Sequence, residues 1–332
     1  MNLQHRIFLL TKLRNYILEN GASWQEAKVQ SGLENGWFIP EFTGRACSQI
    51  AQTMLDPERL QAWAQSYNIP DENHVPKTVG IVMAGNIPLV GFHDWLCVFM
   101  SGHKSVCKLS SKDGVLLKHL VEQLAAWDPE VNRYCEFAER LKGCDAYIAT
   151  GSNNSSLYFE HYFSKYPNII RRNRTSVAIL TGNESKEELD LLADDIFLYF
   201  GLGCRNVSKI FVPEGYDFIP LLGACKRYGW LADFHKFKNN YDYNLALHIL
   251  NGVVYMSTEN VLVVENPSPF SRISQLHYEF YGDKKALEIS LAGNTDLQCV
   301  VGKGHVPFGQ SQDPTLTDYA DGVDTMEFLC RL

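Results

Sequence analysis

Cys204 is the residue of this sequence whose setting best suits covalent chemistry. It ends the stretch Gly201-Leu202-Gly203-Cys204, which lies between an apolar helical pattern and a strand-like run over 208–213. The two glycines permit a backbone turn that larger side chains would block, and such a turn can expose one thiol. A thiolate held there can attack a carbonyl carbon and form a covalent intermediate. The local pattern leaves one alternative open, a packed and inert cysteine beside a glycine turn.

The segment before Cys204 has the pattern of a helix. Ser185 and Glu188 have the spacing of a capping box, in which two side chains satisfy backbone N–H groups at a helix start. Apolar residues follow at helical spacing: Leu189, Leu192, Ala193, Ile196 and Phe200. We therefore predict a helix that runs up to Cys204, and a strand over 208–213 after the glycine turn.

Strand and helix patterns alternate through the first half of the chain. The strand patterns cover 78–84, 105–109 and 146–149, and the helix patterns cover 89–100, 113–127 and a segment that ends near Phe163. This alternation predicts parallel strands in a doubly wound sheet, whose ligands bind at the carboxyl ends of the strands. Asn86, Lys108 and Ser152 fall at or just after those ends.

Helical patterns also occupy the N-terminus, and further strand patterns occupy the second half. The N-terminal helix patterns cover 5–20 and 44–66, with a break near Asp56-Pro57, and a linker follows over 68–76. Strands are predicted at 176–180, 208–213, 259–264 and 297–302, and a short helix near 324–331. The chain therefore divides into a helical N-terminal arm over 1–75, a domain over 76–175 and a second domain over 176–332.

The composition excludes several classes of protein. Of the 332 residues, 45% are hydrophobic and the net charge is -8, which suits a folded core and argues against a nucleic-acid surface. The nine cysteines lack C-x-x-C pairs, which indicates reduced thiols, and the ten histidines are scattered, so we expect no metal. No segment approaches the ~20 apolar residues of a membrane span or resembles a signal peptide, so the cytoplasm is the expected location.

Six short segments occur in an order that matches a known group of enzymes. They are Gly-Asn-Ile-Pro at 85–88, Cys-Lys-Leu-Ser-Ser at 107–111, Thr-Gly-Ser at 150–152, Gly-Leu-Gly-Cys at 201–204, Tyr-Glu-Phe-Tyr at 278–281 and Pro-Phe-Gly-Gln at 307–310. Together they resemble the motifs of the aldehyde dehydrogenase superfamily. Within it, residues 76 to the end look like the bacterial acyl-CoA reductases of the LuxC type, the fatty-acid reductases.

The resemblance implies a fold and a division of labour between the domains. The implied fold is α/β and aldehyde dehydrogenase-like, with a helical N-terminal arm. The domain over 76–175 would be a Rossmann-like nucleotide cofactor-binding domain, and the domain over 176–332 would be an α/β catalytic domain.

The resemblance also assigns a role to each matching residue. It implies that Cys204 is the nucleophile and that the side-chain amide of Asn86 stabilises the oxyanion, as such a donor can. Six further residues would contact the nucleotide cofactor: Lys108, Ser110 and Ser111 at the adenosine ribose, Gly151 and Ser152 at the pyrophosphate, and Glu279 at the nicotinamide ribose. A helix N-terminus suits a pyrophosphate in any case.

Two departures from the superfamily pattern bear on the reaction. Hydrolytic aldehyde dehydrogenases carry a water-activating glutamate where this chain reads 171–176, Arg-Arg-Asn-Arg-Thr-Ser, so the resemblance favours transfer to CoA over transfer to water. NAD-preferring relatives often carry a glutamate where this chain has Ser111, followed by Lys112. A carboxylate there would repel a 2′-phosphate, so we expect NADPH.

The arginines over 171–174 are either ligands for CoA or NADPH phosphates or part of a solvated loop.

The expected reaction is the NADPH-dependent reduction of a fatty acyl-CoA to the fatty aldehyde through a cysteine acyl-enzyme. The alternatives left open are a short-chain acylating aldehyde dehydrogenase that uses NAD(H), and an acyl-transfer or thioesterase-like subunit without hydride chemistry. The expected substrate is an acyl-CoA or acyl-protein thioester, and a homo-oligomer or a partner acyl-activating enzyme is a further candidate assembly. His93, His103 and His235 are candidates for the general acid, each with a structural role as the alternative.

Overall fold

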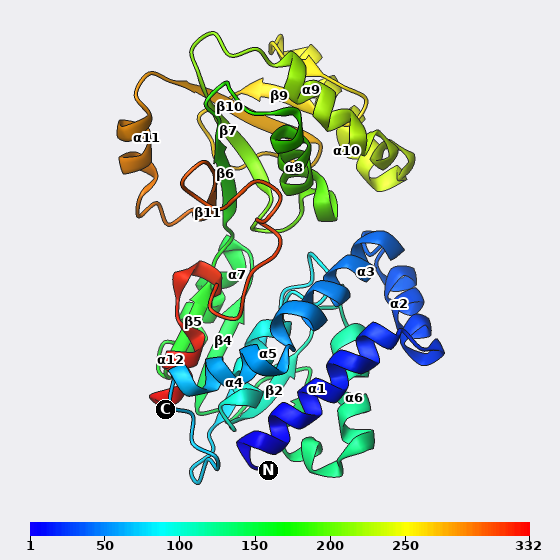
Figure 1. Ribbon diagram of the computed structural model, residues 1–332, viewed down its shortest axis with the longest axis vertical. Coiled ribbons are helices and arrows are strands. Elements are labelled where there is room, and N and C mark those ends of the chain that lie inside the picture. Colours follow the sequence, from blue (N-terminus) through cyan, green and yellow to red (C-terminus); the bar gives the residue numbers. More distant parts are fainter. The chain divides into compact units, whose positions relative to one another are not determined.

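The computed structural model describes all 332 residues, which form two compact units. The first unit comprises Met1–Asn173 and Pro314–Leu332, and the second comprises Arg174–Asp313. Each unit contains one sheet with its own helices (Figure 1). Residues 314–332, which the sequence pattern grouped with the second domain, lie in the first unit. The residues of the predicted N-terminal arm belong to that unit as well.

The first unit is built on a five-stranded parallel sheet with the strand order β3-β2-β1-β4-β5. Its strands are β1 Thr78–Val82, β2 Lys104–Lys108, β3 Cys135–Phe137, β4 Ala146–Thr150 and β5 Asn168–Arg171. The three strands predicted in this region and their parallel pairing are confirmed. The chain moves outward from β1 to β3 and then returns to the other side of β1 at β4. In sheets of this kind the ligand binds where the strand order reverses, at the carboxyl ends of the strands.

The first unit contains eight α-helices, and all except α7 (Asn153–Phe163) contribute residues to one hydrophobic core that includes the sheet. They are α1 Leu3–Glu19, α2 Ala22–Glu34, α3 Pro40–Gln49, α4 Pro57–Ser66, α5 Phe92–Met100, α6 Leu116–Trp127, α7 Asn153–Phe163 and α12 Thr325–Cys330, with a π-helical turn at Ile50–Met54 and 3-10 turns at Pro129–Arg133 and Ala320–Gly322. Leu10 and Leu13 of α1 lie in the same cluster as Trp95 of α5 and Leu120 of α6. Each such buried side chain contributes about 1.5–3 kcal/mol. The predicted N-terminal arm is therefore helical, and it packs as part of the first unit.

Buried polar contacts attach the C-terminal residues to the first unit. The indole N–H of Trp63 donates to the Tyr319 hydroxyl at 2.9 Å, and that hydroxyl donates to the Tyr67 hydroxyl at 2.9 Å. Tyr67 in turn donates to the carboxylate of Asp324 at 2.5 Å. These residues lie at opposite ends of the sequence, so no local pattern could have placed them together.

The second unit is built on a six-stranded sheet with the order β11-β6-β7-β10-β9-β8, in which only the β8–β9 pair is antiparallel. Its strands are β6 Thr175–Ile179, β7 Val207–Pro213, β8 Met256–Ser257, β9 Leu262–Glu265, β10 Gln275–Tyr281 and β11 Leu297–Gly302. Its helices are α8 Lys186–Phe197, α9 Ile219–Cys225, α10 His235–Asn251 and α11 Lys284–Leu291, with 3-10 turns at Leu198–Gly201 and Lys226–Asp233. The four strands predicted in this region correspond to β6, β7, β9 and β11, whereas β8, β10 and the helices α9, α10 and α11 were not predicted.

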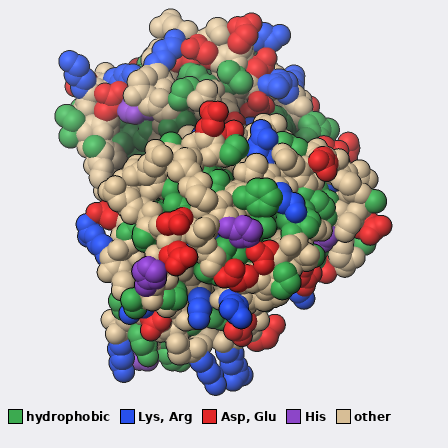
Figure 2. Space-filling view, turned by 60° about the horizontal axis from the view of Figure 1, so that its bottom comes forward, with side chains coloured by type: hydrophobic (Ala, Val, Ile, Leu, Met, Phe, Trp, Pro, Cys, Tyr) green, Lys and Arg blue, Asp and Glu red, His purple; other side chains and the backbone are tan.

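Acidic and basic side chains are mixed across the face of the molecule in Figure 2, without a broad region of one sign. None of the helices combines the length and the apolar character that a membrane crossing requires.

Candidate active site

The turn that carries Cys204 lies just before β7, at the amino end of that strand. It begins with residues in the left-handed backbone conformation. Helix α8 ends at Phe197, and the next residues include Tyr199, Phe200 and Gly201, with φ values of 55°, 58° and 72°. The prediction of a helix up to Cys204 is therefore wrong beyond Phe197. A left-handed residue other than glycine costs roughly 1–2 kcal/mol, so the approach to Cys204 is strained.

Burial of the aromatic rings explains both the strain and the wrong prediction. Tyr199 is 5% exposed and Phe200 is 1% exposed, and the Phe200 ring packs against Phe234 and Phe237 with centroid distances of 5.5 and 5.8 Å. The apolar spacing of a helix continues to Phe200 because its side chain is in the core, although its backbone is not helical. The capping box of Ser185 and Glu188 at the start of α8 is confirmed.

Cys204 differs from most other cysteines of the chain in its exposure. Six of the nine are buried, Cys330 is exposed, and only Cys204 and Cys299 are half-buried. Burial raises the pKa of Cys47 to about 12 and that of Cys225 to about 12, so neither thiol ionises near neutral pH. The thiolate is the reactive form of cysteine, and the half-buried pair is therefore where covalent chemistry is expected.

Ser176 of β6 joins the two half-buried cysteines. Its buried hydroxyl donates to the carbonyl oxygen of Cys204 at 3.0 Å and accepts from the backbone N–H of Cys299 at 3.2 Å. The Cys299 Sγ lies 3.1 Å from the same hydroxyl oxygen. Because the single hydroxyl proton goes to the Cys204 carbonyl, the Cys299 thiol is the donor in this contact. A thiol that donates its proton is less available as a nucleophile, which weighs against Cys299.

In the first unit, three predicted site residues meet at one edge of the sheet. Asn86, Lys108 and Ser152 lie at or after the carboxyl ends of β1, β2 and β4, which are neighbours in the sheet. The loops after β1 and β2 touch, since a Cβ placed at Gly85 would lie only 2.5 Å from the Ser110 Oγ. The sheet therefore brings the predicted oxyanion and ribose residues of this unit together.

Asp113 supports the turn that contains Asn86, a role that the sequence did not reveal. Its Oδ2 accepts the backbone N–H of Leu89 at 2.8 Å, and Leu89 has a left-handed φ of 57°. Burial raises the pKa of Asp113 to about 7, and the hydrogen bond from Leu89 opposes that rise. The carboxyl group therefore changes its charge near neutral pH while it holds the strained residue of this turn.

The predicted pyrophosphate residues lie at the N-terminus of α7. Ser152 is the N-cap, and its Oγ accepts the backbone N–H of Ser155 at 3.2 Å. A Cβ at Gly151 would lie 2.8 Å from the Phe159 ring and 2.9 Å from the Ser155 Cβ, so only glycine fits this close approach. The remaining N–H groups of the first helical turn suit an anion. This geometry fits the phosphate group of a dinucleotide.

Glu279 lies within β10 and already has a partner. Its Oε2 accepts a hydrogen bond from the Lys209 ammonium at 2.5 Å, and the same ammonium donates to the Pro267 carbonyl at 2.7 Å. The Lys209 side chain is 2% exposed, whereas that of Glu279 is 46% exposed. The free face of the Glu279 carboxylate can accept further hydrogen bonds from a hydroxyl group such as that of a ribose.

Arg171 is a structural residue and cannot be the phosphate ligand that its sequence context allowed. Its guanidinium is buried, donates to Asp94 at 2.5 Å and donates to the Thr325 hydroxyl at 2.8 Å. The exposed Arg172 forms an ion pair with Glu160 at 2.6 Å. The three arginines therefore differ: Arg171 forms a buried ion pair, Arg172 forms a surface ion pair, and the half-buried Arg174 donates to the Leu297 carbonyl at 3.0 Å.

Two of the candidate general acids contact backbone carbonyl groups. The Nε2 of His93 lies 3.0 Å from the carbonyl oxygen of Leu316, and that of His103 lies 3.0 Å from the carbonyl oxygen of Leu329. Burial lowers the pKa of His103. These contacts attach α5 and the following loop to the C-terminal residues, which favours the structural role for both histidines.

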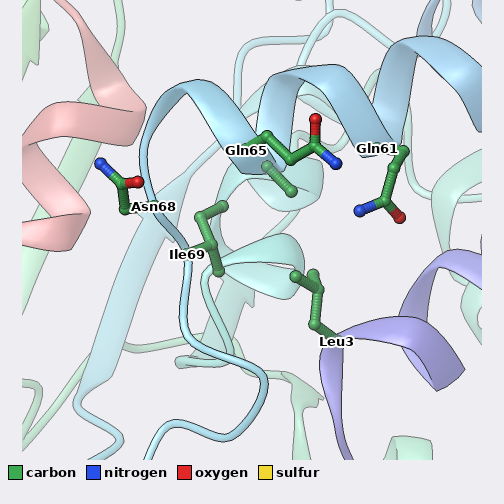
Figure 3. Close-up of a pocket in the computed structure, with 6 residues that line it drawn as sticks. Leu3, Gln61, Gln65, Asn68 and Ile69 are labelled. Carbon is green, nitrogen blue, oxygen red and sulfur yellow. The ribbon is translucent and has the colours of Figure 1, made fainter.

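The hollow shown in Figure 3 lies apart from these residues. It has a volume of about 370 Å³ and is lined by Leu3, Gln61, Ala64, Gln65, Asn68 and Ile69. It contains side-chain amides and aliphatic groups but no predicted site residue. The structure also contains no group of three or more histidine, cysteine or acidic side chains that could hold a metal ion.

Comparison with solved structures identifies the architecture. No protein-family model matches the chain, and no curated protein matches it in sequence. An NAD-dependent aldehyde dehydrogenase from Sinorhizobium meliloti aligns over 91% of this chain and 70% of that chain, with a TM-score of 0.66 and 13% identity. This chain has an aldehyde dehydrogenase-like fold.

Two further structures with the aldehyde dehydrogenase fold agree. The NAD⁺ complex of an aldehyde dehydrogenase from Bacillus cereus has a TM-score of 0.67 and 14% identity, over 91% of this chain and 72% of that chain. Aldehyde dehydrogenase 21 from Physcomitrella patens, in complex with succinate, has a TM-score of 0.66 and 13% identity, over 91% and 74%. The prediction of an α/β, aldehyde dehydrogenase-like fold is confirmed, and at this identity the likeness concerns the fold alone.

Within this fold, the predicted site residues divide between the two units. Asn86, Lys108, Ser110, Ser111, Gly151 and Ser152 belong to the first, and Cys204 and Glu279 belong to the second. Sequence reasoning missed Ser176, Asp113 and Asn206. The one available signal was polarity: Ser176 lies within the apolar strand β6, and Asn206 immediately precedes the apolar strand β7. A buried polar side chain in such a place must have a hydrogen-bond partner.

Proposed function

We propose that this chain reduces a fatty acyl-CoA to the fatty aldehyde with NADPH, through an acyl-enzyme on Cys204. The observation that carries the proposal is the Cys204 turn: a half-buried thiol on a strained, well-packed backbone beside a tethering serine. Strained backbone concentrates at functional sites, and a thiol of this kind suits nucleophilic attack on a thioester. The aldehyde dehydrogenase-like fold is consistent with acyl or aldehyde chemistry.

In the proposed reaction, the chain's own residues act on the acyl group. The Cys204 thiolate attacks the thioester carbonyl, the carbon–sulfur bond to CoA breaks, and CoA leaves with the electron pair. The backbone N–H of Cys204 would donate a hydrogen bond to the oxyanion, and Asn86 is the second donor that the resemblance implies. NADPH, when bound, would supply the hydride that reduces the acyl carbon of the Cys204 thioester. Release of the aldehyde returns the thiolate of Cys204.

The first unit offers groups that fit NADPH. The N-terminus of α7 would hold the pyrophosphate, and the exposed Lys108 and Ser111, with the half-buried Ser110, would contact the adenosine ribose. Ser111 carries no charge and Lys112 is a cation, so a 2′-phosphate meets no repulsion there. In the second unit, the half-exposed carboxylate of Glu279 would bind the nicotinamide ribose.

We propose that the acyl-enzyme exchanges its acyl group with CoA rather than with water. The segment 171–175 contains no carboxylate to activate water, and its Arg171 is bound to Asp94. Without such a base, water is a poor second nucleophile.

Absorbance at 340 nm tests the proposal. The purified protein, supplied with a long-chain acyl-CoA and NADPH, is expected to consume NADPH and release aldehyde and free CoA in equal amounts. Release of CoA without loss of absorbance would instead indicate an acyl-transfer or thioesterase activity. Turnover with a short-chain acyl-CoA and NADH, but not with a long-chain acyl-CoA, would indicate the short-chain alternative.

A further inference from the structure

Asn206 makes an unusual set of contacts beneath the Cys204 turn. The side chain is 1% exposed, and its Oδ1 accepts the backbone N–H of Gly203 at 2.8 Å. Its Nδ2 lies within hydrogen-bond distance of three carbonyl oxygens, those of Asp195 at 3.1 Å, Ile196 at 3.3 Å and Leu198 at 2.9 Å. The one amide group therefore joins the end of α8 to the residue before Cys204.

These contacts satisfy backbone groups that would otherwise lack hydrogen-bond partners at the end of α8. The last carbonyl groups of a helix lack partners within the helix, and the left-handed residues after α8 turn the chain away from them. The amide of Asn206 supplies the missing donors at one end and accepts a backbone N–H at the other. Its backbone contributes as well, because its N–H donates to Gly203 at 3.1 Å and its carbonyl accepts from Ser176 at 3.1 Å.

The space under the turn is small, and both apolar and polar side chains line it. A cavity of about 20 Å³, lined in part by Phe197, Phe200, Gly201, Asn206 and Phe237, lies there. This is little more than the room for one water molecule. Removal of the amide would take away the donor to three carbonyl oxygens and the acceptor of the Gly203 N–H.

We propose that Asn206 is the positioning residue of Cys204, which holds the thiol and the Cys204 backbone N–H in the geometry that attack requires. The inference rests on the proposed function for the catalytic role of Cys204. This role requires both the Oδ1 acceptor and the Nδ2 donor of the side-chain amide. The variant Asn206→Asp keeps the acceptor for Gly203 but loses the donors, and Asn206→Ala loses both.

The test compares the reactivity of Cys204 with and without the amide. The rate of carbamidomethylation of Cys204 by iodoacetamide is measured by peptide mass spectrometry in the wild type, Asn206→Asp, Asn206→Ala and Asn260→Ala. Asn260 is a matched control, since its side chain is 0% exposed in the same unit and donates to the Cys225 carbonyl at 3.0 Å, away from the turn. Thermal melting reports the fold of each variant.

The Asn206 variants are expected to lower the Cys204 alkylation rate at least tenfold, whereas Asn260→Ala should alter it less than twofold. In turnover, kcat should fall by a similar factor while KM for acyl-CoA stays within twofold. The deficit of Asn206→Asp relative to the wild type should shrink as the pH falls, because the protonated carboxyl group regains a donor.

Wild-type alkylation in Asn206→Asp would overturn the inference. Unfolding of Asn206→Asp under conditions where Asn260→Ala is folded would also overturn it, since Asn206 would then support the unit and not the turn. Alkylation does not require acyl-CoA. If the wild type forms no acyl adduct, the proposed function fails, and the alkylation ratios still decide the role of Asn206.

Discussion

The hydroxyl group of Ser176 donates to the carbonyl oxygen of Cys204 across 3.0 Å, and the same hydroxyl lies 3.1 Å from the Cys299 Sγ. Strand β6 thereby contacts both half-buried cysteines: it holds the backbone of Cys204 and makes a hydrogen bond with the thiol of Cys299. The contact restrains the backbone of Cys204. Cys299 is the other half-buried cysteine, so it is the residue most able to compete with Cys204 for a thiol reagent. A labelling experiment can separate the two.

Incubation with acyl-CoA in the absence of NADPH is expected to leave the acyl group on Cys204 and on no other cysteine. Cys204→Ala should abolish both the adduct and aldehyde formation, and Cys204→Ser should keep the fold but lose most of the rate, since an unassisted hydroxyl is a weak nucleophile. Cys299→Ala is the matched control and should retain the adduct. Intact-mass measurement and peptide mapping provide the readout, and an adduct on Cys299 or full activity in Cys204→Ala would contradict the prediction.

Asn86→Ala is expected to lower turnover by about 10²–10³, the usual effect of losing one oxyanion donor. NADPH binding, followed by nucleotide fluorescence, should change little because the amide acts on the developing charge of the acyl group. Asn132→Ala is a suitable control, since that exposed side chain lies in the same unit and donates to the Pro129 carbonyl. A reduction of turnover below threefold in Asn86→Ala would remove this role.

Ser111→Glu is expected to shift the cofactor preference from NADPH toward NADH. The introduced carboxylate would repel a 2′-phosphate and accept hydrogen bonds from the ribose hydroxyls of NADH. The ratio of kcat/KM for the two cofactors measures the shift, with Ser111→Ala as the uncharged control. Equal or better efficiency of the wild type with NADH would show that the preference was wrongly assigned.

Aldehyde oxidation is expected to depend on CoA. With NADP⁺ and a fatty aldehyde, the enzyme should form acyl-CoA readily and free acid slowly, since residues 171–175 offer no carboxylate base. Product analysis by chromatography distinguishes the two acyl products. Equal rates with and without CoA would mean that another residue activates water.

Asp113→Asn is expected to remove a pH-dependent loss of stability from the first unit. Burial raises the pKa of Asp113 from 3.8 to about 7, so the folded state binds this proton more tightly than the unfolded state. Its stabilising contribution is therefore complete below about pH 4 and is lost as the pH rises through about 7. The total effect is on the order of 4 kcal/mol at most.

Urea unfolding at pH 5 and pH 8 checks this prediction. The introduced amide stays neutral at both values, so the stability of Asp113→Asn relative to the wild type should be greater at pH 8. Tryptophan fluorescence suits the measurement, since five of the six tryptophans (all but Trp230) lie in the first unit. The same stability difference at both values would show that the carboxyl group does not titrate in this range.

The elements most easily predicted were those with a strong local pattern. The capping box of Ser185 and Glu188 and the alternation of β1, α5, β2 and α6 follow from spacing over a few residues, because burial of one face imposes a period on the sequence. Helix α10 was missed since only Phe237, Tyr241 and Asn244 are buried along its length, which leaves little periodic signal.

The sequence by itself determined that the chain forms parallel α/β layers, that Asn86, Lys108 and Ser152 lie at or after strand ends, and that Cys204 lies on a glycine turn. These properties depend on neighbouring residues along the chain. Only the tertiary structure decided that the helix stops at Phe197, that Arg171 pairs with Asp94, and that Asn206 and Ser176 hold the Cys204 turn. The physical reason is that buried polar groups must find partners, and those partners come from residues that the fold, not the local sequence, brings within reach.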